Sequence, residues 1–187
     1  NLVFLRPLGL RLVEASATDM GAGIGGGRYD GKNITIEGNA KVSAKGHLWA
    51  AEIGGGANGV GENIKIRGNA QVSAIGGRSS NSFGAGIGGP QNGFRSKNFT
   101  VAENAIVRVQ GGPDGQGFGF GGSNAEEIIP DTASLRDGWI AYYLPDADMD
   151  ADAPWKVVYR NEQGALVTTT DNIRFLSKTD PTCETDG

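Results

Sequence analysis

The chain has 187 residues with 32 glycines, a formal net charge of −4 and 20% charged residues. This length predicts one domain, or one domain with a small appendage. No Lys/Arg cluster is long enough to follow a phosphate backbone, which argues against a nucleic-acid partner, and no apolar run reaches membrane-spanning length. The glycines recur at regular offsets between alternating apolar residues, which favours a built repeat over a flexible linker.

Three copies of one pattern begin at residues 33, 63 and 98. Each copy opens with Asn-apolar-x-apolar, continues through a second alternating run, and ends in a glycine-rich run at 50–56, 84–90 or 117–123. A more degenerate copy precedes them, over residues 1–4, 12–15 and 21–27. Three short period-2 runs in each of four copies predict a β-solenoid, in which each strand stacks on its counterpart and three parallel sheets result.

The alternation assigns an inward-facing column of like side chains to each strand position. A one-residue slip would turn every column outward, so the register is strongly specified. The first strand gives Leu2, Ile34, Ile64 and Phe99, with Phe4, Ile36, Ile66 and Val101. The second gives Val13, Val42, Val72 and Val107, with Ala15, Ala44, Ala74 and Val109. The third gives Met20, Trp49, Phe83 and Gln116, then Ala22, Ala51, Ala85 and Phe118, then Ile24, Ile53, Ile87 and Phe120.

Polar residues also recur between coils. One turn carries Asn39, Asn69 and Asn104. Asparagine tolerates a left-handed backbone and its amide can bond the adjacent coil, so an inward asparagine stack is preferred over three independent surface turns. Glu37 and Arg67 are expected to form an ion pair between neighbouring coils. Two glycosylation sequons begin at Asn33 and Asn98, where the repeat itself begins, and this favours a structural origin for both.

The third strand carries glycine at nearly every position predicted to face outward. Glycine in a strand costs stability and offers no side chain for packing, so its repetition calls for a reason. The first hypothesis is a covering layer anchored by Trp139, Tyr142 or Trp155. The second is an open face that binds a flat glycan, and the third is backbone conformation alone. The outward column at the centre of this strand is Gly23, Glu52, Gly86 and Gly119.

The runs Gly-Ala-Gly-Ile-Gly-Gly-Gly at 21–27 and Asn-Ile-Thr-Ile-Glu-Gly-Asn-Ala at 33–40 carry a family resemblance. They resemble the repeats of bacterial cell-surface, adhesin-like proteins of the right-handed parallel β-helix class, whose coils are similar to those of the pectin-lyase-like superfamily. The resemblance covers about residues 1–123. It implies a cell-surface or extracellular location and contact with carbohydrate. It does not imply catalysis, because such repeats are mostly scaffolds. The predicted fold is all-β, a right-handed parallel β-helix of about four coils with a small β cap at the C-terminus.

Composition changes after the repeats end near residue 123. Residues 124–137 contain Pro130 and acidic residues and are predicted to be a linker. Residues 138–176 contain further strand candidates and are predicted to form a small β cap, because a solenoid needs one to stop its last coil from pairing with another chain. An appended binding module is the alternative for this region. Residues 177–187 are polar and are expected to be a disordered tail of a monomeric protein.

Carboxylates stand at every second residue from 146 to 152 and resemble the opening of a calcium-binding loop. An EF-hand loop would place glycine at position 151 and glutamate at 157, where this chain has Ala151 and Val157. A solvated acidic loop is therefore favoured over a metal site. The weak Ca²⁺ site that remains as the alternative is assigned to Asp146, Asp148 and Asp150.

Glu52 lies near His47 and Trp49, a combination that suggests acid/base chemistry on a sugar. Glycoside hydrolysis normally needs two carboxylates, and no second acid recurs on that face, so the chain is not predicted to be an enzyme. The leading hypothesis is a surface or secreted structural or adhesion module that binds a glycan or a surface protein. The alternative is a fragment of a polysaccharide-active lyase or glycosidase. Candidate ligand-binding residues are Trp49, Glu52, Gly86 and Gly119.

Overall fold

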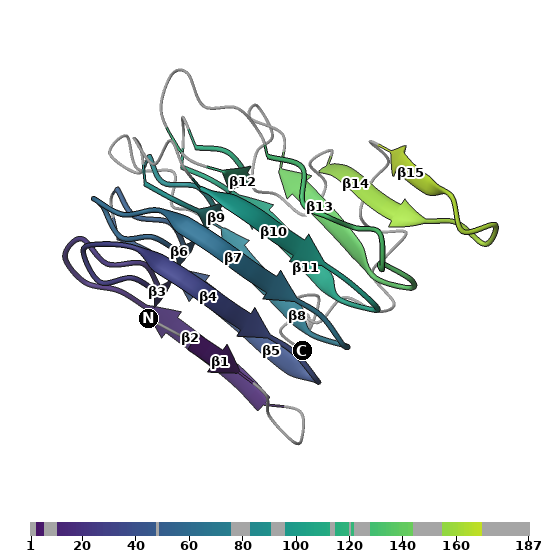
Figure 1. Cartoon of the computed structure of the whole chain (residues 1–187), viewed down its shortest axis with the longest axis horizontal. Helices are drawn as coiled ribbons and strands as arrows, with labels where there is room; N and C mark the ends of the chain where they lie inside the picture. Colours follow the sequence, from purple (N-terminus) through teal and green to yellow (C-terminus); the bar gives the residue numbers. More distant parts are fainter. Residues whose placement is uncertain are drawn as a thin grey trace, which may run out of the picture.

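The computed structural model describes residues 3–5, 11–47, 49–75, 83–90, 96–112, 115–119, 121, 128–143 and 155–169. Every regular element among these residues is a β-strand, and the strands form three sheets (Figure 1). Sheet A contains β1 (Val3–Leu5), β4 (Gly31–Ile36), β7 (Gly61–Ile66) and β10 (Lys97–Val101). Sheet B contains β2 (Arg11–Ser16), β5 (Ala40–Lys45), β8 (Gln71–Ile75), β11 (Ile106–Gln110), β13 (Trp139–Tyr143), β14 (Trp155–Arg160) and β15 (Leu166–Thr169). Sheet C contains β3 (Ile24–Gly25), β6 (Ile53–Gly54), β9 (Ile87–Gly88) and β12 (Phe118–Gly119).

The chain visits sheets A, B and C in turn and then begins the next coil, which gives a β-solenoid of about four turns. Among the described strands, the pairings between coils are parallel, whereas β14 pairs in antiparallel fashion with β13 and with β15. The predicted fold class is therefore confirmed. The core is the stack of inward columns, and its central members Ile34, Ile64 and Val72 are almost completely buried. Ile34 pairs with Ile64 and Val42 with Val72, as the alternation predicts.

The register of the first coil differs from the prediction by one residue. Val3 and Leu5 pair with Ile34 and Ile36, where Leu2 and Phe4 had been expected. Residues 2–5 are all apolar, so this run contains no alternation that would distinguish one register from the other. The parallel pairing in sheet A therefore decides which of these residues align with the core columns.

The fourth coil of sheet C is shifted by two residues. Phe118 pairs with Ile87 and Gly119 with Gly88, whereas Phe120 and position 121 had been expected there. The run Gly-Phe-Gly-Phe-Gly repeats itself every two residues, so a two-residue slip preserves the alternation of phenylalanine and glycine. The shift moves Gly119 out of the column that contains Glu52 and Gly86.

The region after the repeats continues sheet B. β13 pairs in parallel with β11, so Val107 lies beside Ile140 and Val109 lies beside Tyr142. The side chains of Ile140 and Tyr142 are both buried. The rings of Tyr142 and Phe118 are 5.9 Å apart between centroids. Residues 128–137 run along the edge of sheet A, where Asp131 exchanges backbone hydrogen bonds with β10. Both segments therefore pair with the last described coil.

The glycines of the third strand face the backbone of the solenoid itself. A Cβ atom on Gly86 would lie 2.7 Å from the carbonyl oxygens of both Ala74 and Gln110, at the ends of sheet B strands. At Gly23, Gly25, Gly54 and Gly88 as well, the nearest atoms come from the repeats and not from residues 138–176. The predicted outward orientation is therefore wrong at these glycines, and backbone of the repeats lies against them in place of the predicted cover.

The three proposed anchors belong to the strands that extend sheet B, and the ring of Tyr142 lies beside Phe118 of β12. Trp139 pairs with Ile106 in sheet B, and the guanidinium carbon of Arg108 lies 6.0 Å from its ring centroid. Trp155 begins β14 and pairs with Tyr143, on the strand that follows β11. Close approach of backbone within the solenoid, and not a covering layer, therefore accounts for the glycines.

Two ladders of asparagine amides connect the coils. Asn69 donates to Asn39 over 3.0 Å, and Asn104 donates to Asn69 over 2.9 Å. The predicted stack is confirmed, but its inward orientation is wrong, because the following alanines occupy the buried positions and the amides lie at the surface. The second ladder has the same geometry and joins Asn33, Asn63 and Asn98.

The second ladder differs from the first in its backbone, since Asn33, Asn63 and Asn98 have φ angles of 56°, 56° and 60°. We expect Asn69→Ala to lower the free energy of unfolding by about 1 kcal/mol through lost amide hydrogen bonds. Asn63→Ala should cost about 2 kcal/mol, because alanine is also strained in the left-handed region. Urea denaturation measures both, and Asn63→Gly is the control that relieves the strain without restoring the ladder. Equal losses for Asn63→Ala and Asn63→Gly would refute the contribution of the backbone.

Candidate functional site

Trp49 lies at the corner between sheets B and C, in the segment that joins β5 to β6. Its side chain is 46% exposed, so its predicted place in a core column with Met20 and Phe83 is wrong. Backbone pairing between coils in sheet C begins only at Glu52, which donates to the carbonyl oxygen of Ala85. The segments that precede this point differ in sequence from coil to coil. Without strand pairing between them, equivalent side chains are not aligned in one column.

Backbone hydrogen bonds hold the segment around Trp49 against the first coil. The His47 N–H donates to the Gly21 oxygen over 3.0 Å, and the Ala50 N–H donates back to the His47 oxygen over 2.8 Å. We call Gly46, His47, Trp49 and Ala50 the Trp49 turn. The turn is therefore closed on itself and attached to the coil below, while the indole of Trp49 remains accessible to solvent.

A second exposed aromatic ring lies in the segment that joins β3 to β4. Tyr29 is 67% exposed, and its carbonyl oxygen accepts a hydrogen bond of 2.9 Å from the Gly56 N–H. The Met20 oxygen accepts one of 2.9 Å from the Ala57 N–H, next to the Gly21 oxygen that binds the Trp49 turn. Tyr29 was not predicted as a site residue, because it stands outside every repeated column. Its only sequence signal is an aromatic residue in a glycine-rich turn.

Glu52 is buried, with 2% of its surface exposed, although the sequence had assigned it to an outward column. Its Oε2 atom accepts a hydrogen bond from the Gly46 N–H of the Trp49 turn. Burial raises the pKa of Glu52 from 4.5 to about 7, against the opposing effects of the Gly46 hydrogen bond and the Lys45 charge. The carboxyl group thus lies beneath the Trp49 turn and titrates near neutral pH.

The raised pKa of Glu52 makes stability depend on pH. Because the folded pKa of about 7 exceeds the ordinary 4.5, the folded chain binds the extra proton, and stability falls as pH rises from about 4.5 through 7. When the pH is raised from 5 to 8.5, we expect the free energy of unfolding of the wild type to fall by about 2 kcal/mol more than that of Glu52→Gln. Chemical denaturation at both pH values measures the difference. Parallel pH profiles for the two proteins would contradict the assignment.

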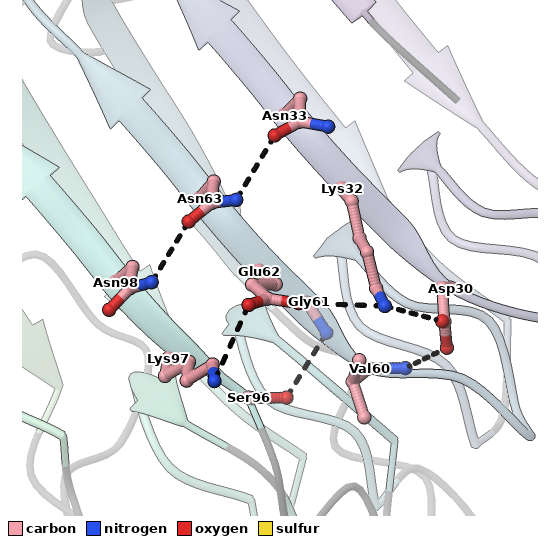
Figure 2. A network of polar contacts seen from close by, with 10 residues as sticks. All are labelled: Asp30, Lys32, Asn33, Val60, Gly61, Glu62, Asn63, Ser96, Lys97 and Asn98. Carbon is pink, nitrogen blue, oxygen red and sulfur yellow. Dashed lines mark hydrogen bonds and ion pairs between the residues drawn. The ribbon is translucent and has the colours of Figure 1, made fainter.

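A second polar cluster lies at the beginnings of β4, β7 and β10 in sheet A, as Figure 2 shows. Lys32 lies 2.9 Å from Asp30 and 3.5 Å from Glu62, and Lys97 lies 3.5 Å from Glu62 on the other side. The hydrogen bond from Lys32 lowers the pKa of Asp30. Asn33, Asn63 and Asn98 form a row beside these charges (Figure 2). The charges of this cluster pair with one another between coils, which explains the cluster without a ligand.

The ion pair predicted between Glu37 and Arg67 is confirmed. The Arg67 Nε–H donates to the Glu37 carboxylate over 2.7 Å, and Glu37 is buried. Arg67 is half exposed, so the pair contributes at most about 1 kcal/mol. Like the Lys32 cluster, this pair connects adjacent coils.

The predicted calcium ligands Asp146, Asp148 and Asp150 lie outside the described residues. Among the residues that are described, no group of three or more His, Cys, Asp or Glu side chains is arranged to hold a metal ion. The same part of the chain contains no helix long and apolar enough to cross a membrane. Of the sequence-predicted ligand-binding residues, Glu52, Gly86 and Gly119 are buried, and Trp49 is exposed on the turn whose Gly46 N–H donates to Glu52.

Comparison with protein-family models, with curated proteins and with solved structures finds no match to this chain. The class that is established is therefore the one that follows from the strand pairing, a β-solenoid of about four turns.

Proposed function

We propose that this chain is a non-catalytic structural or adhesion module of a surface or secreted protein, and that it binds glycan at the Trp49 turn. The observation that carries the proposal is the 46% exposure of Trp49 on a turn fixed by backbone hydrogen bonds. An indole presents a flat apolar face with a polar N–H at its edge, which suits the apolar face of a sugar ring. The repeat's likeness to adhesin-like β-helix proteins supports the same reading.

The arrangement of the coils supports a scaffold in preference to a catalyst. Glycoside hydrolysis by the common mechanisms uses two carboxyl groups that reach the sugar. Glu52 is the carboxyl group nearest to the Trp49 turn in sequence, and it is buried beneath that turn. The charges on sheet A pair between coils and stiffen the solenoid. A rigid rod that presents an aromatic side chain needs no conformational change to bind, so little binding energy is lost in ordering.

Trp49→Ala should weaken glycan binding at least about tenfold, because the stacking face is lost while the turn's backbone contacts remain. A glycan array identifies the ligand, and titration of the wild type and the variant against it gives the two dissociation constants. Leu12→Ala is the matched control, since Leu12 is 66% exposed on β2 of sheet B and its loss should leave the affinity unchanged. Equal affinities of wild type and Trp49→Ala would exclude the Trp49 turn as the binding site.

The wild-type protein and the Glu52→Gln variant distinguish the main proposal from the alternative of a polysaccharide-active enzyme. Incubation with a panel of polysaccharides should release no reducing ends or unsaturated products. Product formation that Glu52→Gln abolishes would replace the adhesion proposal with catalysis at Glu52.

A further inference from the structure

The hydrogen bond between Glu52 and Gly46 connects a buried carboxyl group to the exposed turn of the proposed glycan site. The side chain of Glu52 points away from solvent, and its Oε2 atom accepts the backbone N–H of the first residue of the Trp49 turn. Glu52 itself is held on both sides by sheet C. Its N–H donates to Ala85 in the next coil, and its oxygen accepts from Ile24 in the previous one.

These contacts divide the corner into a fixed part and a part that can move. The backbone of Glu52 is part of a parallel pairing across three coils, whereas among the described residues the Trp49 turn is attached to the first coil by the bond from His47 to Gly21. An isolated carboxylate in a buried position is expensive, and rotation of the side chain toward water relieves that cost. Such a rotation breaks the contact with Gly46 and frees the turn.

We infer that Glu52 is a proton-controlled latch for the Trp49 turn: the protonated carboxyl group keeps the turn closed, and ionisation releases it. The inference rests on the proposed function in one respect, because the released residue is the proposed glycan contact. The latch predicts that Trp49 is presented rigidly in mildly acidic solution and becomes mobile in mildly alkaline solution. Glycan affinity should therefore fall about tenfold from pH 6 to pH 8.5, since a mobile aromatic side chain must be ordered on binding.

The charges near Glu52 are few. Lys45 of β5 favours the ionised form, and His47 is the other titratable group of the adjacent turn. The neighbouring positions Gly23 and Gly86 carry no charge, and β8 and β9 contribute no titratable side chain. Burial outweighs the Gly46 hydrogen bond and the attraction of Lys45, both of which favour the ionised carboxylate, and places the pKa of Glu52 at about 7. The turn is therefore closed below about pH 7 and released as pH rises through that value.

The test uses the full chain labelled with 5-fluorotryptophan, with the ¹⁹F resonance of Trp49 assigned by its absence in Trp49→Phe. From pH 5 to 9 the resonance should move with a midpoint near 7 in the wild type and stay at the low-pH position in Glu52→Gln. His47→Gln is the control, because His47 is the other titratable side chain of the Trp49 turn, and this variant should keep the wild-type midpoint. A flat wild-type profile, or a titration that survives in Glu52→Gln and disappears in His47→Gln, overturns the latch.

This experiment separates failure of the latch from failure of the proposed function. The fluorine titration needs no glycan, so it supports or overturns the latch even if no glycan binds. Conversely, glycan binding through Trp49 with the same affinity at pH 6 and pH 8.5 upholds the binding site and refutes the latch.

Discussion

Replacing Ile53 with aspartate is expected to lower the free energy of unfolding by at least about 4 kcal/mol, because it removes a large apolar side chain and buries a carboxyl group without a partner. Ile53 is completely buried at the centre of sheet C, between Ile24 in the coil before and Ile87 in the coil after. Both neighbours pack against this position, so the substitution damages the contacts of three coils at once. In a solenoid the stability of each coil depends on its contacts with the neighbouring coils. A destabilising substitution in a central coil therefore weakens both the coil before it and the coil after it.

Urea denaturation followed by circular dichroism measures the effect of Ile53→Asp, and Leu12→Asp is the matched control. Leu12 is exposed on sheet B, so the same new charge should change the free energy of unfolding by less than about 0.5 kcal/mol there. A variant at Ile53 with the wild-type midpoint would mean that this column is not the core.

Replacing Gly54 with alanine should also cost the fold several kcal/mol, although only one methyl group is added. Gly54 has a φ angle of 134°, and a Cβ atom there would lie 2.0 Å from the carbonyl oxygen of Gly88. Backbone of the next coil occupies that space, so it must shift and disturb the pairing of β6 with β9. Conformational strain of about 1–3 kcal/mol adds to an overpacking cost of similar size.

The control for Gly54→Ala is Gly27→Ala. A Cβ atom on Gly27 meets no other atom within 4 Å, and the residue is exposed. The melting temperature of the Gly27→Ala variant should therefore remain within a few degrees of the wild-type value. Thermal melts of the two variants compare the positions directly. Similar melting temperatures for both would show that the glycines of sheet C are not explained by close approach of backbone.

The strand columns were predictable because alternation is repeated. Val42, Val72 and Val107 recur at the same offset in three copies, and a period of two residues assigns them to one face. The first coil shows the limit of this argument. Residues 2–5 are uniformly apolar, so hydrophobicity alone does not choose between two registers that differ by one residue.

The candidate site was predictable only in part. Trp49 and Glu52 were singled out as unusual side chains in a glycine-rich region, and they do lie at one corner of the solenoid. Their orientations were both wrong, since Trp49 is exposed and Glu52 is buried. Sheet C strands have only two residues each, so they contain too little alternation to assign an inward and an outward side.

The sequence by itself determined that this chain is a repeat protein with three strands in each coil, and it determined most members of the core. Side-chain alternation within a strand and its recurrence between coils are local properties, and both can be read without coordinates. Only the tertiary structure decided that the glycine strip faces backbone, that β13 extends sheet B, and that Glu52 lies beneath the Trp49 turn. These features depend on which segments meet across the coil. The sequence around a glycine or an isolated glutamate contains no hydrophobic pattern that would indicate which segment packs against it.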